Sequence, residues 1–171
     1  MTHSLPSSSL LSADPQMAAL IAAEERRQRE KIILIPSESL TPPAVREALG
    51  SALTSVYAEG YPREAMMNLP PARLADLDEQ LASYRRYADR RFYKGTEIAD
   101  LVESLAGRRA AACFATDKVP EDRIFANVQP LSGAAANLAI YDAFVAPGET
   151  VMGMALTEGG HLTSPTARRS A

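Results

Sequence analysis

The sequence predicts an α/β fold in which an incomplete parallel or mixed sheet is flanked by helices. The first observation is a strand, a helix and a strand in succession in the last third, at 124–128, 132–145 and 150–156. Two strands joined by a helix imply parallel pairing. The second is a short apolar run at 32–35, ended by Pro36, which is typical of a further strand. Because two or three strands are too few for a sheet with both faces covered, we expect a truncated fold.

The N-terminal part is expected to be a disordered leader followed by helices. Residues 1–13 are polar and lack the charged start and apolar run of a secretory signal. Asp14 and Pro15 form a helix start, because an acid caps the helix and proline suits its first position. Thr41 is the expected cap of a second helix that ends near Gly50.

The middle of the chain is predicted to hold two amphipathic helices. Both segments have apolar residues at spacings of three and four, the period of one helix face. In the first, over 70–91, that face comprises Leu74, Leu77, Leu81 and Tyr84. In the second, over 95–115, it comprises Ile98, Leu101, Val102 and Leu105.

The composition excludes several classes of protein. Apolar residues make up 46% of the 171 residues, which is enough for a core, and a net charge of −3 with interspersed signs indicates no nucleic-acid partner. No apolar run approaches the ~18–20 residues of a membrane span, so we expect no membrane partner. The single cysteine, Cys113, excludes a disulfide framework within the chain and fits a reducing, cytoplasmic compartment. We expect a buried structural thiol there, and no metal site.

The start of the helix at 132–145 is a candidate phosphate site. Ser132 and Gly133 open this helix and alanines follow, so free backbone N–H groups and the helix dipole favour a bound anion. The segment lacks the lysine and the full glycine pattern of nucleotide-binding loops. An ordinary capped helix packed through its alanines is the alternative, and the spacing alone leaves both open.

Three further stretches carry candidate residues with structural alternatives beside them. His161 follows two glycines at the end of a predicted strand, where open α/β sheets bind ligands, but a lone histidine is usually structural. Ser37 follows the run at 32–35 and by itself indicates a turn that leads into a helix. Phe92 and Tyr93 by themselves indicate a packed aromatic pair.

Taken together, these stretches resemble the N-terminal part of the serine hydroxymethyltransferase family, which uses pyridoxal phosphate and has the aminotransferase-like fold type I. The matching segments occur in the family's order over roughly residues 15 to 165. They are "LIPSESLTPPAVREALGSALTSVYAEGYP", "RRFYKGTEIADLVESLA", "ANVQPLSGAAANLAIYDAFVAPGETVMGMAL" and "GGHLT". The resemblance implies a helical arm and active-site loop at 14–63, a helical insertion at 64–89, and the start of the cofactor-binding large domain at 90–171.

The resemblance also implies roles for individual residues. The positions that match the cofactor site are Ser132, Gly133 and Ala134 at the phosphate, Tyr57 in the pocket, and His161, which stacks on the pyridine ring. Those that match the substrate site are Ser37, Tyr57, Tyr93 and Glu59. Those that border the folate site are Leu156, Gly160 and Leu162. Glu59 matches an acid that transfers protons and that in many members reaches the active site of the neighbouring subunit. Placed between two tyrosines in a tight loop, it is expected to be partly desolvated and suited to handling a proton near neutrality.

Several positions depart from the family's pattern. Ala134 stands where a hydroxyl residue is frequent, Phe92 where tyrosine is common, Lys94 where glycine is common, and Leu131 where histidine is frequent. After Thr163 the expected His-Gly is absent. The family's cofactor-binding lysine, the acid that pairs with the pyridinium nitrogen and the arginine that binds the substrate carboxylate would follow this chain. The resemblance therefore implies a fragment that is inactive alone.

The activity implied for the whole protein is the conversion of serine and tetrahydrofolate to glycine and 5,10-methylenetetrahydrofolate by a homodimer or homotetramer. Two alternatives remain. The first is a non-catalytic truncated form that acts as an interaction or dimerisation module. The second is a related pyridoxal-phosphate-dependent aldolase. A nucleotide-phosphate binder that uses the helix start at Ser132 is a more distant third.

Overall fold

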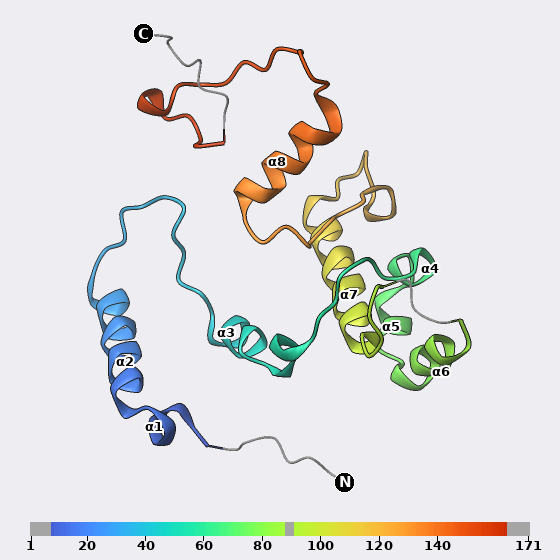
Figure 1. The fold of residues 1–171 in the computed structure, drawn as a ribbon, viewed down its shortest axis with the longest axis horizontal. Helices are drawn as coiled ribbons and strands as arrows, with labels where there is room; N and C mark the ends of the chain where they lie inside the picture. Colours follow the sequence, from blue (N-terminus) through green and yellow to red (C-terminus); the bar gives the residue numbers. More distant parts are fainter. Residues whose placement is uncertain (1–7, 88–90, 164–171) are drawn as a thin grey trace. The chain divides into compact units, whose positions relative to one another are not determined.

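The computed structural model describes residues 8–87 and 91–163. The chain divides into two units, Met1–Ser55 and Val56–Ala171, and each is described by itself (Figure 1). The sequence after Thr163, where the family's His-Gly is absent, lies outside the described residues, as do residues 1–7 of the predicted leader. The predicted domain boundaries stay predictions.

The first unit consists of short helices and an extended connection. Its elements are α1 (Leu10–Ala13), α2 (Pro15–Glu30), α3 (Pro43–Leu49) and the 3-10 turn η1 (Ala52–Ser55). The predicted start of α2 is confirmed, because the Asp14 carboxylate accepts a hydrogen bond of 2.9 Å from the Met17 N–H. Two other expectations are wrong. Part of the predicted leader is the helix α1, and α3 is capped by Pro42 without a side-chain bond, not by Thr41.

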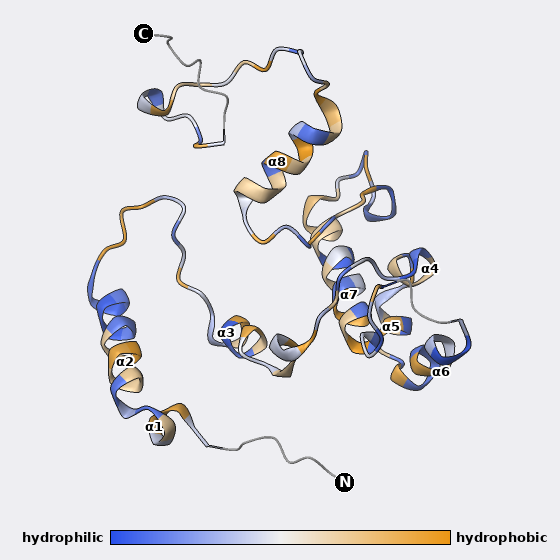
Figure 2. Cartoon of the chain, viewed as in Figure 1, coloured by the Kyte–Doolittle hydropathy of each residue, from blue (hydrophilic) through white to orange (hydrophobic). Residues whose placement is uncertain are grey.

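No described residue of the first unit is buried. Several large apolar side chains are almost fully exposed there, among them Ile32 at 86% and Leu34 at 85%. Figure 2 shows the hydrophobic colouring of this extended segment, which follows α2. A run of apolar side chains in solvent needs a partner to be stable, so this unit does not form a core of its own.

The second unit is built around the long helix α7 (Glu97–Phe114). Three short helices precede it, α4 (Glu64–Met67), α5 (Pro71–Leu74) and α6 (Leu77–Tyr87), and η2 (Glu121–Arg123), α8 (Gly133–Phe144) and η3 (Leu156–Glu158) follow it. Helices α4 and α5 pack against α7. Their small hydrophobic core consists of Met66, Leu74 and Leu101, with Leu69 and Leu105 packed against it.

The helix predicted over 70–91 is interrupted. The carboxylate of Asp76 accepts a hydrogen bond of 3.0 Å from the Glu79 N–H. This is the geometry of an N-cap, so the chain starts a new helix, α6, after α5 has ended at Leu74. The helix predicted over 95–115 is present as α7.

The predicted sheet is not confirmed, because the described residues contain no strand. The segments 32–35, 124–128 and 150–155 are extended but carry no inter-strand ladder. A parallel strand is stabilised by neighbouring strands and by cover on both faces, and neither is present around these segments. Most of their large apolar side chains are accordingly exposed, Phe125 at 74% and Met152 at 95%, and Ile33, Ile124 and Val151 are half-buried.

The single cysteine is not buried. Cys113 lies exposed in the last turn of α7, so the expectation of a buried thiol is wrong. No helix within the described ranges combines the length and the apolar character that crossing a membrane requires.

Candidate functional site

The loop at 57–62 brings two predicted site residues together. The rings of Tyr57 and Tyr93 lie with centroids 5.8 Å apart and tilted by 45°. Gly60 has φ +101°, a conformation that favours glycine, and the following Pro62 is buried. The loop therefore turns sharply between Tyr57, which is 77% exposed, and a buried anchor.

Glu59 lies at the tip of this turn with its side chain exposed. Its backbone carbonyl accepts a hydrogen bond of 3.1 Å from the Phe92 N–H. The expected desolvation of Glu59 is wrong for this chain, because the phenol rings do not cover its carboxylate. The backbone of Glu59 is held, and its side chain points to solvent.

The loop is attached to α7 through the buried Arg91, a residue that was not among the predicted site residues. The guanidinium donates to the carbonyl oxygens of Ala58 and Gly60, the latter at 2.9 Å. It also forms ion pairs with Asp100 and with Glu103, the latter at 2.6 Å. Burial acts most strongly and by itself would lower the pKa of Arg91. The hydrogen bonds that Arg91 donates to Asp100 and Glu103, together with the negative charges of these carboxylates, outweigh it and raise the pKa, so the guanidinium stays charged.

Gln129 is a second residue that holds the loop and that the sequence did not single out. Its amide donates to the carbonyl oxygen of Gly60 and to the carboxylate of Glu103, both at 2.7 Å. Nearby, the side-chain amide of Asn127 donates to the Tyr61 hydroxyl at 3.3 Å. These contacts connect the loop to the segment that leads into α8.

The predicted phosphate residues form the first turn of α8. Ser132 is the N-cap, and its hydroxyl oxygen accepts a hydrogen bond of 3.2 Å from the Ala135 N–H. Ser132, Gly133 and Ala134 are exposed, and a Cβ added at Gly133 would meet no atom within 4 Å. Since the first N–H groups of a helix have no partner within it, this open turn of small residues fits a phosphate group.

His161 is connected to α8 by a chain of hydrogen bonds. Its Nδ1 accepts from the Thr163 N–H at 3.2 Å and lies 2.7 Å from the Thr163 hydroxyl. That hydroxyl accepts a hydrogen bond of 2.8 Å from the side-chain amide of Asn137 on α8. The structure thus brings the predicted ring-stacking histidine and the helix with the predicted phosphate turn into one network.

Two of the positions predicted to border folate, Leu156 and Gly160, lie on a tight turn before His161, and the third, Leu162, follows it. Gly159 has φ +95°, and the Gly160 N–H donates to the Ala155 carbonyl at 2.9 Å. A Cβ added at Gly160 would overlap the carbonyl group of Met154, so only glycine fits there. Leu156 and Leu162 are 52% and 81% exposed.

Ser37 is the one predicted site residue in the first unit. It is exposed and lies in a turn closed by a hydrogen bond of 3.0 Å from the Glu38 N–H to the Ile35 carbonyl. It is described within that unit alone.

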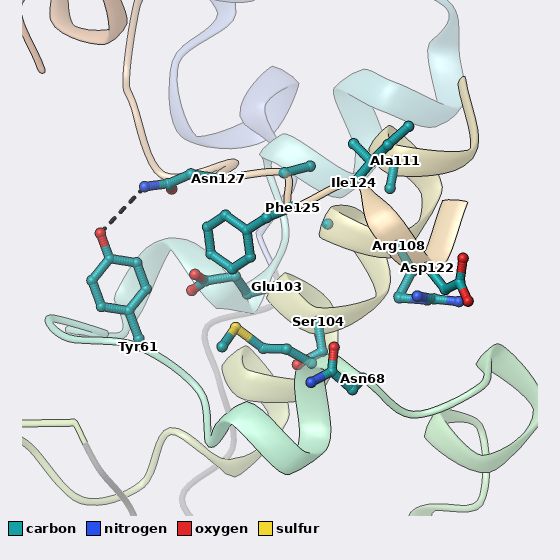
Figure 3. A pocket seen from close by; sticks show the side chains of 13 residues that line it. Tyr61, Asn68, Glu103, Ser104, Arg108, Ala111, Asp122, Ile124, Phe125 and Asn127 are labelled. Carbon is teal, nitrogen blue, oxygen red and sulfur yellow. Dashed lines mark hydrogen bonds between the residues drawn. The ribbon is translucent and has the colours of Figure 1, made fainter. Parts of the chain in front are cut away.

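Figure 3 shows a pocket of about 50 Å³ in the second unit, between α7 and the segment 122–127, with Tyr61 at its side. The buried Ser104 hydroxyl lines it and has no hydrogen-bond partner within the described part of the chain. None of the residues predicted for the cofactor, substrate or folate lines this pocket, so it is separate from the predicted site. The part of the chain that the structure describes contains no group of three or more potential metal ligands.

Comparisons with known proteins agree with the family resemblance. The sequence model of one family, described as serine hydroxymethyltransferase, matches residues 10–86 and 82–170. A serine hydroxymethyltransferase from Acidothermus cellulolyticus is 46% identical over 158 residues, which make up 92% of this chain and 29% of that protein. Another, from Thiobacillus denitrificans, is 43% identical over 154 residues, which make up 90% of this chain and 29% of that protein.

The chain spans about 29% of the length of these curated relatives. The two family matches nevertheless extend over most of the chain. The chain therefore belongs to the serine hydroxymethyltransferase family of pyridoxal-phosphate-dependent transferases, whose cofactor domain has fold type I.

Proposed function

We propose that this chain is the N-terminal part of an enzyme that transfers the hydroxymethyl group of serine to tetrahydrofolate, giving glycine and 5,10-methylenetetrahydrofolate. The observation that carries the proposal is the family match over 10–86 and 82–170. The meeting of Tyr57 with Tyr93 and the connection of His161 to α8 support it, because each joins residues from separate motifs of the family. We expect a cytoplasmic enzyme.

Pyridoxal phosphate is the cofactor that we propose, and the residues present fit it. The first turn of α8 offers free N–H groups and the Ser132 hydroxyl to the phosphate, and Gly133 leaves room for a close approach. The ring of His161 would stack on the pyridine. When bound, the cofactor supplies an electron sink for the carbon from which the hydroxymethyl group departs.

The remaining predicted residues would bind substrates and move a proton. Ser37 would contact the serine carboxylate, and Tyr57 and Tyr93 would line the serine site. The exposed carboxylate of Glu59 would take and return the proton of the substrate hydroxyl. Leu156, Gly160 and Leu162 would border tetrahydrofolate.

The rest of the active site would come from other segments and from another copy of the chain. The only lysines of the 171 residues are Lys31, Lys94 and Lys118, and none lies in a motif that matches the family's cofactor-binding lysine. We therefore expect the chain to be inactive alone and active when a homodimer or homotetramer also contains the segments that its longer relatives possess.

Complementation tests this function. The chain is co-expressed with the part of the Acidothermus cellulolyticus relative that the match leaves uncovered, and the conversion of serine with tetrahydrofolate is measured. We expect turnover from the pair and none from either piece. Turnover of threonine as the main activity, without folate, would instead indicate an aldolase. A pair that is assembled and loaded with pyridoxal phosphate but lacks both activities would contradict the proposal.

The exposed apolar side chains of the first unit favour a second candidate, an interaction module. Ile32 and Leu34 lie in solvent and would be covered by a partner. If the chain binds a full-length copy tightly and lowers or leaves unchanged its activity per active site, the module is the better description. Restoration of activity to the complementary piece excludes a purely non-catalytic role.

A further inference from the structure

Three consecutive carbonyl oxygens of the loop at 58–60 are bound by two consecutive residues. Arg91 donates to the carbonyls of Ala58 and Gly60, and the Phe92 N–H donates to the carbonyl of Glu59 between them. These donors lie more than thirty residues away in the sequence. The loop backbone is thus fixed on both sides of Glu59 while the Glu59 side chain stays exposed.

The guanidinium that binds the loop is itself fixed by α7. Its Nε donates to Asp100 and its Nη2 to Glu103, which leaves Nη1 for the two loop carbonyls. The side chain of Arg91 is 1% exposed. A planar guanidinium with these donors engaged can aim Nη1 in only one direction, whereas a lysine ammonium could not make all four contacts.

Gln129 also bonds both to a carbonyl of the loop and to a carboxylate of α7. Its amide nitrogen joins the Gly60 carbonyl to the same Glu103 carboxylate that binds Arg91. Because Gln129 lies three residues before the N-cap of α8, the loop is also connected to the proposed phosphate turn.

We propose that Arg91, assisted by Gln129, is a positioning residue that fixes the direction in which Glu59 presents its carboxylate for proton transfer. The proposal rests on the proposed function for the identity of that proton transfer. In this proposal Arg91 contacts neither the substrate nor the cofactor. It acts through the backbone of the loop, and a change at Arg91 or Gln129 should therefore affect only the steps that need Glu59.

The first test measures the loop without any activity. The Phe92 amide, which is bonded to the Glu59 carbonyl, reports docking of the loop through its hydrogen exchange, measured by mass spectrometry with residue resolution in the 171-residue chain. We expect exchange at least tenfold faster in R91K and in Q129A. Gln129 is exposed, so Q129A keeps the fold even if R91K does not. The amide of Asp100, bonded to Thr96 at 2.8 Å within the start of α7, should be unchanged in Q129A.

R108K is the matched control, because Arg108 is another arginine paired with a carboxylate, 2.9 Å from Glu121, and does not bind the loop. It should leave the Phe92 amide unchanged. Unaltered exchange of Phe92 in Q129A and in a folded R91K would overturn the proposal, and so would a wild-type amide with no protection.

The second test asks whether the effect passes through Glu59. In the complemented enzyme, Q129A and R91K should lower kcat at least tenfold with the KM for serine and the affinity for pyridoxal phosphate within twofold. In an E59Q background the same changes should have no further effect on kcat, because the group that they position is gone. If the losses in kcat of E59Q and of the changes at Arg91 or Gln129 were additive, Arg91 and Gln129 would have a merely structural role. If the assembled pair loaded with pyridoxal phosphate is inactive, the proposed function fails, whereas hydrogen exchange still decides whether Arg91 and Gln129 hold the loop.

Discussion

Arg91 and Asp100 form an ion pair whose side chains are only 1% and 2% exposed, in a unit whose buried hydrophobic residues are few. The described part of that core consists of Met66, Leu74, Leu101 and Ala111. Half of the buried side chains described in the second unit are polar or charged, among them Thr96 and Ser104. A buried charge pair at the centre of a small core makes the attachment of the 58–60 loop and the stability of α7 depend on the same contacts.

Removal of the guanidinium should destabilise the second unit strongly. Arg91→Met removes the guanidinium from its buried ion pair with Asp100, and breaking a buried pair from one side costs about 3–5 kcal/mol. We expect this loss in the free energy of unfolding, measured by urea titration of the chain with far-UV circular dichroism.

The control for this prediction is the exposed ion pair between Arg73 and Glu79, whose side chains are 57% and 39% exposed. Arg73→Met should cost no more than about 1 kcal/mol, because solvent screens such pairs. Equal losses for the two variants would show that burial of Arg91 has no energetic consequence.

The sequence predicted features that depend on neighbouring residues and missed those that depend on distant ones. The caps at Asp14 and Ser132 were predictable, because a capping side chain bonds within three residues. The strands were not confirmed, since an extended run at 124–128 needs partner strands and these lie in no described segment. The burial of Arg91 was missed because its loop partners are 31 and 33 residues away and its own surroundings read as a solvated charged run.

The candidate site shows the same division. The resemblance placed Tyr57 and Tyr93 in one pocket, and the structure brings their rings together. Desolvation of Glu59 was inferred from its neighbours in sequence, but those phenols are themselves exposed and shield nothing. Cover for Glu59 would have to come from other segments or from another copy, which the proposed oligomer would bring.

The helix α2 should respond to acid through Glu24. Arg27 donates two hydrogen bonds to this carboxylate, at 2.7 and 2.8 Å, and Gln28 donates another at 2.8 Å. These bonds lower the pKa of Glu24 from 4.5 to about 2. The pKa of Glu24 is lower in the helix than in the unfolded chain, so the ionised carboxylate stabilises α2. This stabilisation is complete above about pH 4.5 and disappears as the pH falls toward 2.

Helicity measured by far-UV circular dichroism checks this for the wild type and Glu24→Gln. The wild type should be the more helical of the two above pH 4.5, and the difference should vanish near pH 2. A difference that grows as the pH falls would contradict the assigned sign.

Two glycines should respond oppositely to alanine. At Gly160 a Cβ would overlap the Met154 carbonyl, so Gly160→Ala must rearrange the turn before His161. At Gly133 a Cβ meets open space, so Gly133→Ala should leave α8 intact. If the first turn of α8 binds phosphate, Gly133→Ala should still lower the affinity of the complemented enzyme for pyridoxal phosphate at least tenfold, because the added methyl group obstructs the approach of the phosphate. An unchanged affinity would show that the phosphate does not bind at this turn.

The network around His161 predicts which ring nitrogen carries the proton. Nδ1 accepts a hydrogen bond from the Thr163 N–H and therefore carries no hydrogen, so the Thr163 hydroxyl, 2.7 Å away, is the donor in its contact with Nδ1 while it accepts from Asn137. The neutral ring must then carry its hydrogen on Nε2. Nitrogen-15 NMR of the chain labelled at histidine reports this tautomer directly. We expect the Nε2–H form in the wild type and a mixture of tautomers in Thr163→Val, which removes the hydroxyl donor. Asn137→Leu should act in the same direction but more weakly, because it frees the hydroxyl without removing it. A wild-type ring with its proton on Nδ1 would mean that the network does not hold His161 in solution.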